Sequence, residues 1–300
     1  MFIKELYEKY REEFRSRLND DMMTPQEYEE QFGPILETMD NVMIDEPSGK
    51  GIIYYRLAEE DDMRVCRIPV FGYYASSEKV LTRLFIQLSE KLVDTGTTNF
   101  QVHLYAHDAQ ALQLFSMMQF GYMAETGIIK HDLLLSDISK SYEIRTLDKA
   151  EILNRWDEIW KMTDALIAHL RQAPIFYPAT EFSEEEYKSF FTDEDTRLHV
   201  AFDECGSIIG MIETNSESSI MIRADKRSVN IGEAYVVPEK RGCGLADALF
   251  LYALTYEKER GAEYLWVEHG TANPNARGFW NKYFTPYEYE LIRRITEYKT

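Results

Sequence analysis

The stretch Glu233-Ala-Tyr-Val-Val-Pro-Glu-Lys-Arg-Gly-Cys-Gly-Leu-Ala-Asp-Ala-Leu249 carries the strongest fold signal in this 300-residue sequence. Its apolar, β-branched start predicts a strand that runs to Val237 and stops at Pro238. Apolar residues with helical spacing begin near Leu245, after a turn that holds two glycines. In a strand–turn–helix of this kind, the N–H groups of the first helical turn point into one concavity, and the helix dipole favours an anion there.

The turn itself predicts a pyrophosphate site, because its residue types suit a phosphate ligand. Gly242 and Gly244 let the backbone approach a phosphate without a Cβ in the way, and Arg241 adds a cationic donor. A Walker A loop would end in Gly-Lys-Ser/Thr, and a dinucleotide-binding GxGxxG would need glycine where Asp247 stands, so neither pattern fits. The alternative interpretation is a strand–turn–helix with incidental glycines.

The pattern Arg-Gly-x-Gly-x-Ala after Val-x-Pro, within residues 229–250, resembles the acyl-CoA-binding loop of the GNAT acetyltransferase superfamily. The downstream element Asn273-x-x-Ala276-x-x-Phe279 resembles the second cofactor segment of the same family. The resemblance implies acetyl-CoA as acyl donor, with no metal. The residues that it assigns to the cofactor are Val236, Val237, Arg241, Gly242, Cys243, Gly244, Leu245, Ala246, Asn273, Ala276 and Phe279.

The resemblance also implies a mechanism in which an amine attacks the thioester carbonyl directly, without a covalent enzyme intermediate. Glu233, on the strand before the turn, is the candidate that takes the proton of the amine; the alternative is a solvated or ion-paired strand glutamate. The family often uses a tyrosine after the last phenylalanine to protonate the leaving thiolate, but Trp280 stands there. Tyr283, one turn further on, is the substitute that we expect, and a core tyrosine is the alternative.

Two residues are candidates for contact with the acceptor. Tyr177 lies in a proline-flanked loop within the region that covers the acceptor site in GNAT folds, and His269 ends the strand beside the expected cleft. Surface or core positions are the alternatives for both residues. We expect the acceptor to be a small amine, and the net charge of −19 favours a cationic one.

Composition and cysteine spacing exclude several other classes of protein. A net charge of −19 opposes binding to nucleic acid and to anionic membranes. The run Ala248–Leu254 is far shorter than the roughly 20 apolar residues of a membrane span, and charges at Lys4 and Glu5 exclude a signal-peptide core. The three cysteines are widely separated and form no CxxC pair. These features predict a cytoplasmic protein without a structural metal.

An internal repeat indicates two similar domains. Asp108-Ala-Gln-Ala111…Phe115 corresponds to Asn273-Pro-Asn-Ala276…Phe279, and each segment follows a predicted strand that comes after a long helix. We therefore predict an α/β (α+β) protein with two tandem GNAT-like domains, each a mixed, mostly antiparallel sheet flanked by helices. The alternative is two ordinary α/β domains whose likeness is coincidental.

The predicted domains are a degenerate copy over residues 1–138 and a catalytic copy over residues 139–300. In the first copy the loop position reads Val70–Ser77, which has one glycine, no arginine and two tyrosines, so we expect it to have lost the cofactor. A final strand over Tyr287–Ile295 is expected to close the second copy. A non-catalytic acyl-CoA-binding or protein-interaction module is the alternative function, and the oligomeric state is left open.

Overall fold

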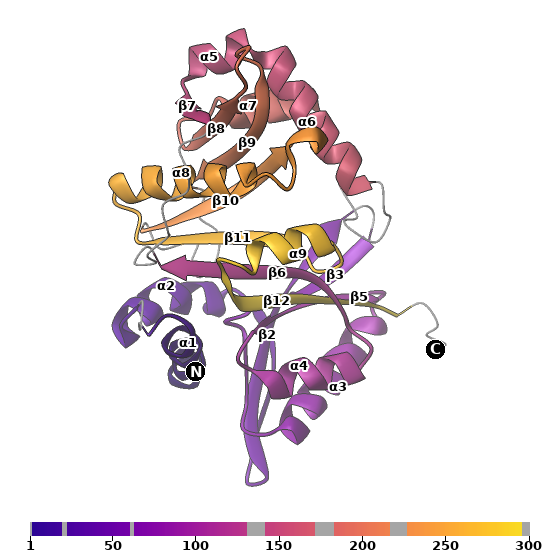
Figure 1. Cartoon of the computed structure of the whole chain (residues 1–300). Helices are drawn as coiled ribbons and strands as arrows, with labels where there is room; N and C mark the ends of the chain where they lie inside the picture. Colours follow the sequence, from indigo (N-terminus) through magenta and orange to yellow (C-terminus); the bar gives the residue numbers. More distant parts are fainter. Residues whose placement is uncertain are drawn as a thin grey trace. The chain divides into compact units, whose positions relative to one another are not determined.

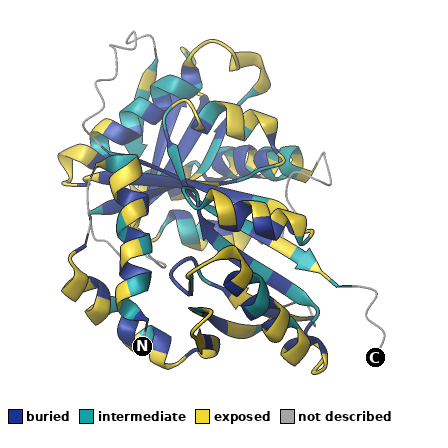
Figure 2. Ribbon diagram, turned by 90° about the horizontal axis from the view of Figure 1, so that it is seen from below, coloured by how far each residue is buried: buried dark blue, intermediate teal, exposed yellow. Residues whose placement is uncertain are grey.

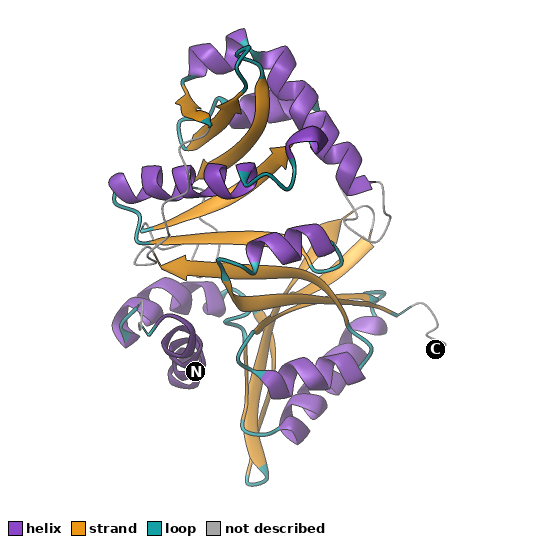
Figure 3. Ribbon diagram, viewed as in Figure 1, coloured by secondary structure: helices purple, strands orange, loops and turns teal. Residues whose placement is uncertain are grey.

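The computed structural model of the chain describes residues 2–19, 23–60, 63–130, 142–171, 183–216 and 227–295. It divides into two compact units, one made of Met1–Thr126 with Thr285–Thr300 and the other of Gly127–Phe284. In each unit, strands of mixed direction pack against helices (Figure 3), as the predicted fold class requires. Among the described residues, no helix is both long and apolar enough to cross a membrane.

The first unit begins with two helices. In α1 (Ile3–Leu18), apolar residues spaced about four apart lie on one buried face. The next helix, α2 (Pro25–Glu37), starts with a capping box in which the Thr24 side chain accepts from the Glu27 N–H and the Glu27 carboxylate accepts from the Thr24 N–H. The start of α2 is therefore encoded locally.

The sheet of the first unit follows the order β1-β2-β3-β5-β12, and the short strand β4 pairs with β2. Helices α3 (Glu78–Val93) and α4 (Ala109–Met117) contribute leucine and phenylalanine side chains to the core of this unit. Strand β6 (Gly121–Lys130) begins in the first unit and ends in the second. The other strands are β1 (Asp40–Glu46), β2 (Gly49–Glu60), β3 (Met63–Ile68), β4 (Tyr73–Ala75), β5 (Asn99–Tyr105) and β12 (Thr285–Arg294).

Two segments whose residue pattern suits one continuous element are each divided in the structure. The strand-like segment over residues 65–74 forms β3 and β4, because a turn closed by the Gly72 N–H and the Pro69 carbonyl separates them. The helical pattern over residues 152–170 is divided at Arg155 into α5 (Lys149–Asn154) and α6 (Trp156–Arg171). Apolar periodicity does not register the one-residue interruption at Arg155.

The second unit has the strand order β11-β10-β9-β8-β7. Strands β7 to β10 pair antiparallel with their neighbours, and β10 pairs parallel with β11. The strands are β7 (Glu143–Leu147), β8 (Thr196–Phe202), β9 (Ile208–Asn215), β10 (Ser228–Val236) and β11 (Tyr264–Gly270), and the other helices are α7 (Glu184–Phe191), α8 (Leu245–Glu259) and α9 (Pro274–Trp280).

Two apolar clusters form the core of the second unit. One joins α8 and α9 to strand residues such as Ile212 and Ile231, and the other joins α6 and α7 to residues such as Met211 and Tyr235. Gly210 lets α8 pack closely, because a Cβ there would lie 2.9 Å from Leu249 Cδ1. Figure 2 shows buried residues concentrated on the strands and exposed residues on the outer sides of the helices.

The last strand lies in the first unit, and this corrects the expectation that it closes the second copy. Strand β12 pairs antiparallel with β5, from Glu288 opposite Tyr105 to Arg294 opposite Asn99. Strand propensity identifies such a segment, but it contains no information about which partner the segment joins. The predicted boundary between residues 138 and 139 falls within 131–141, outside the described residues.

Candidate active site

The two parallel strands β10 and β11 part at the centre of the second unit. Their described pairing runs from Ser228 opposite Tyr264 to Ile231 opposite Val267. Beyond that point β10 continues to Val236 and β11 continues to Gly270, and Figure 1 shows the two strands diverging. An extended ligand that enters such an opening can hydrogen-bond with the strand backbone as an added strand does.

A β-bulge lies at the point where the strands part. On the other side of β10, Ile231 faces Thr214 and Ala234 faces Ile212, so two residues of β10 occupy the space opposite the single residue Glu213. An extra residue of this kind bends the strand and redirects its side chains, and bulges are common beside active sites. The bulge contains Glu233, the residue that the sequence predicts as the proton acceptor.

The Glu233 side chain is half-buried and has a defined partner. The Tyr187 hydroxyl, on α7, donates to Glu233 Oε1 at 3.1 Å. Burial raises the pKa of the Glu233 carboxyl, and the hydrogen bond from Tyr187 opposes this shift. A carboxylate with a raised pKa is a stronger base, so Glu233 has the chemistry of a general base.

Two residues beside Glu233, Tyr187 and Glu213, are not among the candidates assigned from the sequence. Glu213 is fully buried, and its burial raises the pKa of the carboxyl to about 8. One signal was available in the sequence, because Glu213 is the only charged residue in the otherwise apolar run Ile208–Glu213. For Tyr187 no sequence signal distinguishes a site residue from a core residue.

The glycine turn connects β10 to α8, and its backbone conformation favours glycine at two positions. Gly242 and Gly244 have φ of 73° and 80°, in the left-handed region that favours glycine. A Cβ at either position would meet nothing within 4 Å, so the space over the turn is open. Gly244 is the N-cap of α8 and supplies no side-chain hydrogen bond to the first turn, which leaves an exposed helix N-terminus suited to an anion.

Two hydrogen bonds hold the turn, one from the Arg241 side chain and one to the backbone of Cys243. Arg241 is exposed, and its Nε donates to the carbonyl oxygen of Val236 at 2.9 Å while the guanidinium lies 5.2 Å from the centre of the Tyr235 ring. The carbonyl of Cys243 accepts from the Tyr142 hydroxyl at 3.0 Å. A positive charge is thus held beside the turn on the surface, where a phosphate could reach it.

The second predicted cofactor segment forms α9. Asn273 is its N-cap and is buried, and its Oδ1 accepts from the backbone N–H groups of Asn275 and Ala276 at 3.1 and 3.2 Å. Ala276 and Phe279 are partly buried and pack against the cluster that contains α8. The amide nitrogen of the Asn273 side chain is left for other partners, because the oxygen makes both helix-capping contacts.

The predicted general acid, Tyr283, has its hydroxyl hydrogen-bonded to the Asp247 carboxylate on the first turn of α8. Burial and this carboxylate raise the pKa of the Tyr283 hydroxyl. Trp280, the last residue of α9, is buried in the apolar cluster that includes α8. A role for Tyr283 in protonating a thiolate therefore requires that its hydrogen bond to Asp247 be exchanged.

Of the two predicted acceptor contacts, only His269 lies in the part of the chain that the structure describes. His269 is buried near the end of β11, and its Nδ1 lies 3.4 Å from the carbonyl oxygen of Gly270. Tyr177 falls within 172–182, outside the described residues. Over the described ranges, no group of three or more His, Cys, Asp or Glu side chains could hold a metal ion.

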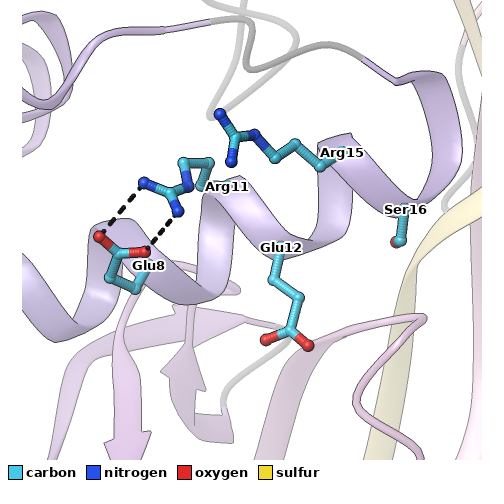
Figure 4. Close-up of a pocket in the computed structure, with 5 residues that line it drawn as sticks. All are labelled: Glu8, Arg11, Glu12, Arg15 and Ser16. Atoms are coloured by element: carbon cyan, nitrogen blue, oxygen red, sulfur yellow. Dashed lines mark hydrogen bonds and ion pairs between the residues drawn. The ribbon is translucent and has the colours of Figure 1, made fainter.

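A separate depression of about 450 Å³ lies along α1 in the first unit (Figure 4). Its five lining residues all come from this one helix, and Arg11 forms an ion pair with Glu8. Substrate sites usually combine apolar walls with polar groups that converge from several elements, so this surface does not resemble one. The residues that line it are Glu8, Arg11, Glu12, Arg15 and Ser16.

Comparison with known proteins agrees with this geometry. Residues 163–284 match the model of the acetyltransferase (GNAT) family. No curated protein matches the chain significantly. Among solved structures, a GCN5-related N-acetyltransferase from Sphaerobacter thermophilus is similar with a TM-score of 0.57 at 14% sequence identity, over 97% of this chain and 91% of that chain.

Two further structures are similar at lower scores. A tandem GNAT protein from the clavulanic acid biosynthesis pathway has a TM-score of 0.46 at 12% identity, over 86% of this chain and 85% of that chain. L-PGS from Bacillus licheniformis has a TM-score of 0.46 at 14% identity, over 90% of this chain and 92% of that chain.

The Sphaerobacter structure shows the fold alone, and its coverage extends that fold over both units of this chain. The family match lies within the second unit from residue 163 onward, where the parted strands and the glycine turn are found. Residues 163–284, in the second unit, therefore form a domain of the acetyltransferase (GNAT) family, and the fold of the Sphaerobacter structure extends over the first unit as well.

Proposed function

We propose that the second unit transfers the acetyl group of acetyl-CoA to the amine of a small acceptor by direct attack. The observation that supports this most is the parting of β10 and β11 at the bulge, with the open glycine turn following one strand and Asn273 following the other. These features provide, within one unit, a place for an anionic group, a slot for an extended chain and a carboxylate.

The same residues define how acetyl-CoA would be held. The N–H groups at the start of α8 and the Arg241 guanidinium would bind the pyrophosphate. The backbone of Val236 and Val237 would pair with the pantetheine arm and polarise the thioester carbonyl. Asn273 would hydrogen-bond the arm through its side-chain amide, with Ala276 and Phe279 packing beneath it.

In the transfer step, the amine nitrogen forms a bond to the carbonyl carbon, and the bond from that carbon to sulfur breaks. Glu233 takes the proton that the attacking nitrogen loses, either directly or through one water. The sulfur leaves as a thiolate and is protonated, and Tyr283 is the residue proposed as donor once it has exchanged its bond to Asp247. The products are an N-acetylated amine and free CoA.

A cationic acceptor is the class that the site favours. The Glu233 carboxylate lies against the Tyr187 hydroxyl, and the Tyr187 ring is 6.2 Å from that of Trp160 on α6, centre to centre. A carboxylate beside aromatic rings suits an ammonium group. His269 and Tyr177 remain proposed contacts for the same substrate.

The test is turnover of acetyl-CoA with a panel of small amines, read as release of free thiol. We expect release with cationic amines, and a loss of at least a hundredfold in kcat for Glu233→Gln with unchanged affinity for acetyl-CoA. Glu259→Gln, near the end of α8, is a matched control that leaves the bulge intact. Acetyl-CoA binding without turnover across the panel would instead favour a non-catalytic acyl-CoA-binding module.

A further inference from the structure

The Glu213 carboxyl hydrogen-bonds the backbone of the β10 bulge. Its Oε2 accepts from the backbone N–H of Glu233 at 3.3 Å, and its Oε1 accepts from Asn215 Nδ2 at 2.9 Å. The side chain is fully buried on β9, directly opposite the extra residue of β10. A buried carboxyl oxygen that accepts from a bulge N–H replaces the ladder partner that the bulge removes.

Gly232 shows that the bulge is built around this carboxyl. A Cβ at position 232 would overlap Glu213 Oε2. The φ of Gly232 is outside the left-handed region, so the backbone itself would accept alanine. The absence of a side chain at this position therefore serves the close approach of Glu213 to the backbone.

A row of buried polar side chains continues from Glu213 across the strands. Asn215 Nδ2 also donates to Asn230 Oδ1 at 3.1 Å, and Asn230 Nδ2 donates to the carbonyl oxygen of Trp266 at 3.4 Å. The row thus connects β9, β10 and β11 immediately before the last two part. Buried polar groups that are mutually satisfied hold their elements in one arrangement.

We infer that Glu213 is a positioning residue for acetyl transfer: it fixes the β10 bulge and thereby holds the Glu233 carboxylate at the parting of β10 and β11. This inference rests on the proposed function of Glu233. Glu213 has no exposed surface, so it acts through the Glu233 backbone and does not touch the acceptor. Its loss should change the rate of transfer and leave the binding of acetyl-CoA at the glycine turn unchanged.

The first test compares Glu213→Ala with Glu213→Gln in the full chain. Alanine removes the acceptor for the Glu233 N–H, whereas glutamine keeps an oxygen there. We expect Glu213→Ala to lower kcat at least tenfold with acetyl-CoA affinity within twofold of wild type, and Glu213→Gln to retain kcat within threefold. Equal loss in both variants, or an unchanged kcat in Glu213→Ala, would overturn the inference.

A second variant keeps the test valid if Glu213→Ala fails to fold. Gly232→Ala leaves the carboxyl in the chain and displaces it from the bulge, so it should lower kcat by a similar factor. If both changes act through one contact, the double variant should lose no more than the larger of the single losses. Independent, multiplicative losses would contradict a shared mechanism.

Hydrogen–deuterium exchange gives a readout that does not depend on turnover. Glu213→Ala should speed exchange at least tenfold in peptides that cover residues 229–236, and should leave peptides from β8 unchanged. If wild type turns over no amine, the proposed function fails, while this exchange pattern still decides whether Glu213 fixes the bulge. Unchanged exchange at residues 229–236 would exclude that role.

Discussion

The two units place different chemistry at the start of corresponding helices. In the second unit, Asn273 caps α9 using its side-chain oxygen alone. In the first unit, Asp108 caps α4, and its carboxylate also receives the Lys9 ammonium and the Tyr73 hydroxyl. The Lys9 ammonium lies 3.9 Å from the centre of the Tyr73 ring. Where the second unit presents a neutral amide, the first unit forms an internal ion pair.

We propose that the first unit has lost a ligand site while its core is retained. Helix α1 of the first unit is fastened a second time, one turn further on, where Glu13 accepts from the His107 backbone N–H at 2.8 Å. Side chains of α1 thereby satisfy polar groups of His107 and Asp108, which follow the end of β5. The first unit is thus stabilised at this position by its own helix.

The central helices differ in the opposite sense. Helix α3 of the first unit packs on its sheet through apolar side chains such as Leu84 and Leu88. Helix α8 of the second unit adds a buried ion pair, in which Glu257 Oε1 accepts from Arg197 Nε and from Thr214 Oγ1, each at 2.6 Å. The second unit therefore depends on polar groups in its interior.

The largest effect that we expect comes from breaking this ion pair. Glu257→Ala leaves the buried Arg197 charge without its carboxylate and should lower the free energy of unfolding by about 3–5 kcal/mol. Denaturant unfolding measures this loss. Glu263→Ala, which breaks the exposed pair with Arg227, should cost less than about 1 kcal/mol. Similar losses in the two variants would show that the buried ion pair contributes no more to stability than the exposed one.

The next effect concerns the glycine turn of the second unit. Arg241→Ala with Gly244→Val should weaken acetyl-CoA binding a hundredfold or more, since about 1.5–3 kcal/mol is lost with the charged contact and valine strains the left-handed position. Calorimetry measures the affinity. Gly206→Val, at a glycine with φ of 76° and open space, is the control for strain alone and should leave affinity unchanged.

A pH effect should follow from His199 in the second unit. Burial, with a contribution from Arg197, lowers the pKa of His199 to about 3, below its ordinary value of 6.5. The folded state disfavours protonated His199, whereas the unfolded state binds the proton at the ordinary pKa of 6.5. The contribution of neutral His199 to the free energy of unfolding is therefore complete above pH 6.5 and falls by about 1.4 kcal/mol per pH unit between 6.5 and 3. His199→Gln should flatten the stability profile in that window, measured by denaturant unfolding. A slope equal to that of wild type would show that His199 is not the group involved.

The smallest effect tests the ion pair of the first unit. Lys9→Met should cost about 1–3 kcal/mol in unfolding, because Asp108 keeps its bonds from Tyr73 and the α4 backbone. We propose that the chain binds one acetyl-CoA, and a titration should give one site in wild type and in Lys9→Met alike. Two equivalent sites in wild type would contradict the proposal that the chain binds one acetyl-CoA.

Sequence alone determined the features that depend on a few neighbouring residues. The capping box of α2, the left-handed glycines at 242 and 244 and the N-cap role of Asn273 all follow from local backbone chemistry. For the same reason, the pattern of the turn is enough to predict the resemblance to the GNAT cofactor loop. Local geometry has short range, so a short stretch of sequence is enough to specify it.

Only the tertiary structure decided which distant segments meet. Strand β12 joins β5 in the first unit, the β10 bulge faces Glu213, and the Tyr283 hydroxyl bonds Asp247. Each of these pairings depends on register and on the side of an element that is buried, and neither is encoded in residue spacing along the chain. The physical reason is that strand and helix periods specify which face is apolar, while the partner of that face is selected by packing of the whole unit.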